Sequence, residues 1–253
     1  MSNKREDNDR DIIFGRNAVA EAIKSGRAID TLLVARGAYS GSVPHIIAKA
    51  KESGIVVKDV DSKKLDFICA NGVHQGIAAF AAIKQYSSVE DILLAAEQKN
   101  EPPFIVICDK IEDPHNLGAI IRTAYAAGAH GIIVPERHSA PLSFVVGKAS
   151  AGSVEYMPVA RVKNITVTLK SLKEKGLFAY CADMDGELYT ETDFKGAIVL
   201  VIGSEGQGVS RLVKENCDFI VRIPMSGHIN SLNASVAAGI LIYEAVRQRN
   251  TEI

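Results

Sequence analysis

The sequence contains no tryptophan, few aromatic residues and only four cysteines in 253 residues. The cysteines are scattered, without a Cys-x-x-Cys pair or a histidine at zinc-ligand spacing, so we expect reduced thiols: Cys69, Cys108, Cys181 and Cys217. No apolar run reaches the roughly 18 residues that cross a bilayer. The N-terminal MSNKREDNDRD is too polar for a signal peptide. These absences predict a cytoplasmic protein without a membrane span or a bound metal.

The net charge of −1 hides a difference between the two ends of the chain. Residues 14–84 contain 10 Lys and Arg against 6 Asp and Glu, a balance of +4. Residues 101–253 contain 15 against 17, a balance of −2. The first segment is therefore the better candidate for contacting a polyanion.

The chain divides near a charged stretch that is followed by two prolines. Residues 1–11 have no apolar periodicity and predict a disordered tail. Residues 12–84 predict a small α/β domain. Residues 85–100, with a helical pattern at 91–98, lie before Pro102–Pro103 and are predicted to be a linker. Residues 101–253 predict a second, larger α/β domain.

Both domains alternate helical and strand patterns. In the first domain we expect helices at 15–26, 43–54 and 62–69, and strands at 31–36, 55–60 and 76–83. In the second we expect strands at 104–109, 131–135, 155–161, 177–183, 197–203 and 218–224, and helices at 117–128, 144–152, 164–176, 233–249 and from Ser210. In the second domain, repeated alternation of this kind predicts a parallel sheet covered on both faces.

Three junctions between strand and helix patterns carry polar or glycine residues. They are NLGAIIR (116–122), GSEGQG (203–208) and SLN (231–233). In a parallel α/β sheet such junctions meet along one edge, where ligands bind. Asn116 and Asn233 are also suited to cap the helices that we expect to follow them. Arg122 interrupts an Ala- and Ile-rich helix, which indicates either a structural salt bridge or recognition of an anion.

The glycine-rich GSEGQG differs from the common phosphate-binding loops. It lacks the Gly-Lys-Ser/Thr of a Walker loop and the G-x-G-x-x-G of a Rossmann nucleotide enzyme. Its glycines suggest positive φ or close approach of a ligand, while Glu205 would repel a phosphate. The six histidines show no metal spacing and no Ser-His-Asp order. The small residues of the last helix suit either core packing or a subunit interface: Ala234, Ala237, Ala238 and Gly239. Together these features favour a transferase that positions its substrates.

The three blocks, in this order and at these separations, resemble the signature motifs of the SPOUT superfamily of tRNA and rRNA ribose 2′-O-methyltransferases. The resemblance spans residues 101–250. FGRNAVAEAI and VHQGIAA are similar to the ribosomal-protein-like, RNA-binding domain that precedes the catalytic domain in the bacterial 23S rRNA guanosine-2′-O-methyltransferase branch.

This resemblance implies a catalytic domain with a parallel sheet and a deep trefoil knot, which general topology rules disfavour. It also implies S-adenosylmethionine as methyl donor, RNA as substrate and a homodimer. Mapped onto this sequence, the family's working residues are Asn116, Arg122, Glu205, Ser231 and Asn233, and its donor-binding residues are Gly203, Ile223 and Leu232. Arg122 would hold the phosphate next to the target ribose rather than act as a base, because a guanidinium stays protonated in proteins.

The alternatives are a tRNA ribose 2′-O-methyltransferase and a non-catalytic RNA-binding factor of the same fold. The intact Arg122, Glu205 and Asn233 argue against the second.

Overall fold

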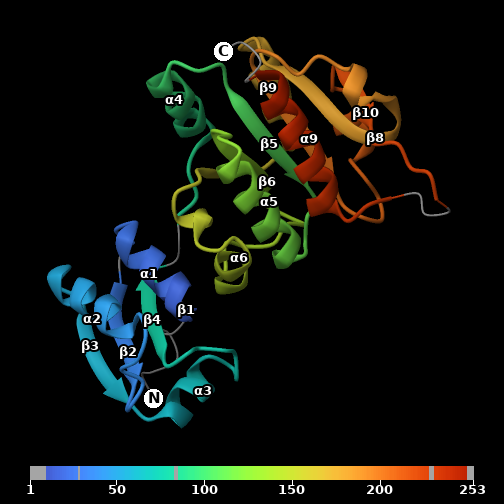
Figure 1. Ribbon diagram of the computed structural model, residues 1–253. Coiled ribbons are helices and arrows are strands. Elements are labelled where there is room, and N and C mark those ends of the chain that lie inside the picture. Colours follow the sequence, from blue (N-terminus) through green and yellow to red (C-terminus); the bar gives the residue numbers. More distant parts are fainter. Residues whose placement is uncertain (1–9, 28, 83–84, 228–230, 250–253) are drawn as a thin grey trace. The chain divides into compact units, whose positions relative to one another are not determined.

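The computed structural model describes residues 10–27, 29–82, 85–227 and 231–249. It divides into two compact units (Figure 1). Unit 1 comprises residues 1–85 and 142–156, and unit 2 comprises residues 86–141 and 157–253. Across the described residues, no helix combines the length and the apolarity needed to cross a bilayer.

Unit 1 is a mixed four-stranded sheet in the order β1-β4-β2-β3. The strands are β1 (Arg10–Phe14), β2 (Ile29–Ala35), β3 (Val56–Val60) and β4 (Ile77–Ala82). Helices α1 (Arg16–Lys24) and α2 (Val43–Glu52) share the core on one face, and α3 (Ser62–Ile68) contributes Leu65 to the core on the other. Arg10 and Asp11 pair with β4, so the predicted disordered tail is wrong at its last two residues. Residues 1–9 lie outside the described part.

Segment 142–156, predicted to belong to the second domain, packs into unit 1. It contains α6 (Phe144–Ala149) and the short helix η2 (Ser153–Glu155). The Arg27 guanidinium donates to Asp11 at 2.8 Å and to Glu155 at 2.9 Å, and all three side chains are largely buried. The Tyr156 hydroxyl donates to Glu21 at 2.7 Å. This network explains why the boundary differs from the prediction, since breaking a buried ion pair is costly.

Unit 2 is built on a sheet of six strands in the order β10-β8-β9-β5-β6-β7, every neighbouring pair being parallel. They are β5 (Phe104–Asp109), β6 (Gly131–Pro135), β7 (Val159–Val162), β8 (Phe178–Leu188), β9 (Ile198–Gly203) and β10 (Phe219–Arg222). The predicted parallel sheet is confirmed. Every residue of β5 and β9 is buried, as expected for strands covered on both faces.

Helices cover both faces of this sheet. The core on one face includes residues of α4 (Val89–Lys99), α7 (Ile165–Glu174) and α8 (Arg211–Lys214). On the other, α5 (Pro114–Ala126) packs against α9 (Ala234–Arg249), which also contacts β9 (Figure 1). Ala234 and Ala238 are buried, so core packing accounts for part of the small-residue pattern of α9.

Residues 86–100 belong to unit 2, so the predicted linker is wrong. Helix α4 begins with a capping box between Ser88 and Asp91. Its Ile92 is fully buried, and a Cβ on Gly131 would lie 2.4 Å from the Ile92 side chain. Glycine at 131 therefore lets α4 approach β6. The charged residues that suggested a linker lie on the exposed face of this helix.

Candidate active site

The site begins where β5 and β9 end side by side, with Asp109 opposite Gly203. Asp109 is only 3% exposed, and one of its carboxylate oxygens accepts from the Ser210 backbone N–H at 2.7 Å and from the Ser210 hydroxyl at 2.5 Å. This buried carboxylate ties the far end of the glycine-rich loop to the sheet. Asp109 was not among the predicted site residues, although an acidic residue at the end of an apolar strand indicates such a role.

The loop at residues 203–208 closes on itself. Ser204 and Gly208 exchange backbone hydrogen bonds of 3.2 and 2.9 Å. A Cβ on Gly203 would lie 2.0 Å from the Gly208 carbonyl carbon, and Gly208 has φ +63°. The predicted positive φ is confirmed at Gly208, whereas Gly203 is required because the backbone of the loop itself leaves no room for a side chain. The turn presents Glu205 outward, and its side chain is exposed.

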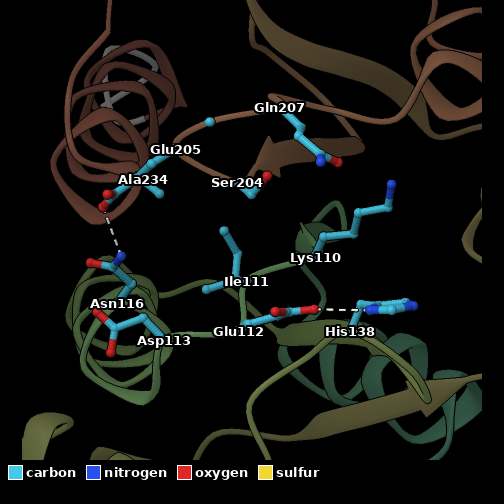
Figure 2. Close-up of a pocket in the computed structure, with 11 residues that line it drawn as sticks. Lys110, Ile111, Glu112, Asp113, Asn116, His138, Ser204, Glu205, Gln207 and Ala234 are labelled. Carbon is cyan, nitrogen blue, oxygen red and sulfur yellow. Dashed lines mark hydrogen bonds and ion pairs between the residues drawn. The ribbon is translucent and has the colours of Figure 1, made fainter.

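Three predicted site residues meet through their side chains. Asn116 Nδ2 donates to Glu205 Oε1 at 2.8 Å, and Asn233 Nδ2 donates to the same oxygen at 2.6 Å (Figure 2 shows the first of these bonds). Asn233 Nδ2 also donates to Asn116 Oδ1 at 2.9 Å. We refer to Asn116, Glu205 and Asn233 as the polar trio.

Asn233 also caps a helix, and this cap fixes the orientation of its side-chain amide in the polar trio. Its Oδ1 accepts from the backbone N–H of Ser235 at 2.9 Å and of Val236 at 3.3 Å, so it caps α9 as predicted. Backbone N–H groups can bond only to the oxygen of the amide. The Nδ2 group must therefore face Glu205, and the helix cap orients the donor of the site.

Asn116 was also predicted as a helix cap, and that prediction is wrong. Helix α5 begins at Pro114, and Asp113 is its N-cap, accepting from the His115 N–H at 2.9 Å. Proline suits the first helical position, so the stronger signal was Asp113-Pro114. Asn116 lies in the first turn of α5, and its side chain bonds to Glu205 and Asn233 instead of capping the helix.

The loop 203–208 separates two cavities. The first, of about 470 Å³, is lined by the three predicted donor-binding residues Gly203, Ile223 and Leu232, and by Glu205 and Ser231. We name it the Leu232 cavity. The second, of about 440 Å³, is lined by Lys110, Ile111, Glu112, Asn116 and His138 (Figure 2). We name it the Lys110 cavity. Residues 204–207 and Ala234 line both, so Glu205 lies on a shared wall.

Arg122 is the one predicted site residue outside this group. It lies on α5, is exposed and lines neither cavity. It follows Asn116 by six residues, which places it about 9 Å along the helix and on a different face. Its guanidinium forms no salt bridge with another described residue, so of its two predicted roles the structural salt bridge is not found in the described part of the chain.

The parallel α/β fold, with two cavities that share a wall at the carboxyl end of the sheet, has the architecture of an α/β enzyme that binds ligands at this edge. Comparison with known proteins identifies the family. Residues 103–243 match the SpoU rRNA Methylase family, and residues 12–87 match the family of RNA 2′-O ribose methyltransferase substrate-binding domains. The chain belongs to the SpoU rRNA Methylase family, and the predicted resemblance is confirmed.

Relatives match over nearly the whole chain. YacO of Bacillus subtilis, assigned by name to the TrmH family of tRNA/rRNA methyltransferases, is 47% identical over 95% of this chain and 96% of its own length. The SpoU methyltransferase AviRb of Streptomyces viridochromogenes, solved with AdoMet, superposes with a TM-score of 0.82 at 27% identity, covering 99% of this chain and 95% of that one. An AdoMet-bound rRNA methyltransferase of Sinorhizobium meliloti gives 0.80 at 29% identity, covering 96% and 89%.

Proposed function

We propose that this protein transfers a methyl group from S-adenosylmethionine to the 2′-hydroxyl of a guanosine ribose in 23S rRNA. The observation that carries the proposal is the polar trio on the wall between two cavities. The solved relatives with AdoMet support the donor, and the substrate-binding match supports the ribose. The names of the matched family and of the S. meliloti relative support rRNA.

The Leu232 cavity fits the methyl donor. Its volume of about 470 Å³ is in the range of small-ligand sites. Ile202, Val221, Ile223 and Leu232 give it apolar walls for an adenine, and the loop 203–208 adds backbone N–H and C=O groups. When bound, S-adenosylmethionine supplies an electrophilic methyl group on its sulfonium.

The polar trio positions the acceptor. Glu205 Oε1 already accepts two amide N–H groups, which fixes the carboxylate and leaves Oε2 to accept a hydrogen bond from a ribose hydroxyl. Holding two reactants in a reactive geometry removes much of the entropic barrier of a bimolecular step. Ser231, exposed at the rim of the Leu232 cavity, is placed to contact the same ribose.

Arg122 serves the RNA rather than the donor. An exposed guanidinium can grip a phosphate with two parallel hydrogen bonds and favours the developing alkoxide through its charge. Unit 1 supplies the wider RNA contact, in keeping with the +4 balance of residues 14–84.

We further propose a homodimer and the trefoil knot of the family. On α9, Val236 is 50% exposed and Tyr243 51% exposed, and the two are seven residues apart on one face. A second copy would cover this apolar face. Light scattering of Tyr243→Asp should then report the monomer mass of 27.2 kDa, while the wild type reports twice that mass. A monomeric wild type at micromolar concentration would refute the dimer.

Labelled methyl transfer to unmodified 23S rRNA fragments and to tRNA, followed by nucleoside mass analysis, tests the substrate. We expect 2′-O-methylguanosine from the rRNA. Label only in tRNA would favour the alternative substrate, and label on a base would refute the chemistry. No transfer to either RNA, with the donor still bound, would favour a non-catalytic RNA-binding factor.

A further inference from the structure

The Lys110 cavity has features that the methyl-transfer site does not explain. In Figure 2 the polar trio's Asn116 and Glu205 lie on one side, while Lys110 and Gln207 lie on the other, with Ile111 between them. Ile111 is 2% exposed and offers an apolar floor. The cavity therefore extends beyond what a ribose needs.

The backbone of this cavity is held in an unfavourable conformation at two places. Lys110 has φ +60° and His138 has φ +59°, a region that costs residues with side chains about 1 kcal/mol or more. The other non-glycine residue with positive φ in the described part of unit 2 is Asn100, which caps the C-terminus of α4. Lys110 and His138 both line the Lys110 cavity. Side chains at these strained positions therefore indicate that the cavity needs them.

Two of the charged side chains that line the cavity, Glu112 and Lys110, together complement one base. Glu112 Oε1 and His138 Nδ1 share a hydrogen bond of 3.0 Å, and no described residue bonds to Glu112 Oε2. A carboxylate such as that of Glu112 can accept hydrogen bonds from two adjacent N–H groups, and guanine presents such a pair at N1 and N2. An ammonium such as that of Lys110 can donate to guanine O6 and N7. Among the common bases, guanine alone presents both edges.

We propose that the Lys110 cavity holds the guanine of the methylated nucleotide, with Glu112 accepting from N1–H and N2–H, and Lys110 donating to O6. His138 orients Glu112, and Ile111 contacts the face of the base. This inference rests on the proposed function, because it takes the base to be joined to the ribose at the polar trio. It assigns base selection to residues outside the three family motifs.

The first test measures binding without catalysis. Guanosine 5′-monophosphate and inosine 5′-monophosphate, which lacks the 2-amino group, are titrated into the full chain saturated with S-adenosylhomocysteine, and ligand NMR follows binding. We expect the wild type to prefer the guanine nucleotide on the order of tenfold. Glu112→Gln should reduce that preference to about twofold. Lys110→Met should weaken both nucleotides equally, because both carry O6.

Two exposed residues of α7 provide matched controls, Lys170→Met and Glu174→Gln. They make the same chemical changes away from the cavity and should leave binding unchanged. Lys110→Gly separates function from stability, because glycine tolerates φ +60°. It should keep or raise the thermal midpoint while weakening both nucleotides.

Equal binding of both nucleotides by the wild type, or an unchanged preference in Glu112→Gln, would overturn the inference. If the proposed methyl transfer is wrong but the base-binding inference is right, the results differ. The preference for the guanine nucleotide then persists and responds to Glu112→Gln, but the wild type transfers no methyl group to guanosine ribose in any RNA tested.

Discussion

Replacing Asn233 by alanine tests whether the helix cap and the polar trio are coupled. The change removes the Oδ1 that accepts from the Ser235 and Val236 N–H groups and the Nδ2 that donates to Glu205 and Asn116. Loss of an N-cap costs about 1 kcal/mol. The exposed bonds of Nδ2 add at most about 1 kcal/mol, since water can replace them. The free energy of unfolding should fall by about 1–2 kcal/mol, which lowers the thermal midpoint by about 2–8 °C.

The effect on methyl transfer should be larger than the effect on stability. Without Nδ2, Glu205 keeps one of its two amide donors and can leave the shared wall. A misplacement of about 1 Å can cost about 100-fold in rate. We therefore expect the rate at saturating donor to fall about 100-fold, with the donor affinity changed little. Calorimetric melting, initial rates of label transfer and donor titration measure these quantities.

Two further variants separate the cap from the trio. Asn233→Ser keeps a good cap but has a side chain too short to reach Glu205, so it should recover stability and remain inactive. Asn164→Ala is the matched control, because Asn164 caps α7 by accepting from the Val167 N–H at 3.1 Å and lines neither cavity. It should lose stability and stay active. If Asn233→Ser recovers activity together with stability, Asn233 acts only as a cap and the reasoning fails.

Three further expectations follow from the site and from the two units. Arg122→Ala should reduce the rate of methyl transfer at least about 100-fold, with little change in donor affinity by calorimetry. Arg122→Lys should recover little of that rate. An equal loss of rate and of donor affinity would mark Arg122 as a structural residue. Residues 86–253, which retain α4 and only segment 142–156 of unit 1, should bind the donor but lose RNA affinity and its salt dependence in filter binding. Unchanged RNA affinity would contradict a role of residues 10–85 in RNA binding. Burial and then Lys99 lower the pKa of His130, whose Nδ1 accepts from the Phe104 N–H at 3.0 Å. The contribution of neutral His130 to the free energy of unfolding is therefore complete above the unfolded-state pKa of about 6.5 and is lost as the pH falls through the lower folded-state pKa. Urea unfolding at pH 5 to 8 should show this loss of stability. In His130→Gln this contribution to the pH dependence should be absent.

Most elements of the fold could be predicted because their signals are local. Strand β5 and helix α5 follow from short apolar runs, and Gly128, with φ +76°, ends α5 as its position indicated. Strand β1 was missed because Arg10 and Asp11 are charged. Its existence depends on pairing with β4, some 70 residues away, which no local pattern reveals.

The same distinction holds for the site. The junction argument predicted that Asn116, Glu205 and Asn233 would converge, because parallel strands deliver their loops to one edge. It could not predict which atoms would bond, since Asn116 and Asn233 are 117 residues apart. Nor could it place segment 142–156 in unit 1, because the Arg27–Glu155 bond joins residues 128 apart. Lys110 and His138 lacked any motif, and only their φ angles and the shared cavity identify them.

In the proposed function, the loop 203–208 would position two substrates with a small number of residues. Its first residue pairs with β5, and buried Asp109 fixes Ser210 just beyond its last. Both ends of the loop are tied to the sheet, and Glu205 also accepts from two amides, Asn116 of α5 and Asn233 at the N-cap of α9. In the proposed function, a carboxylate restrained in this way would orient the ribose hydroxyl. This arrangement requires glycine at position 203, where any side chain would collide with the backbone of the loop.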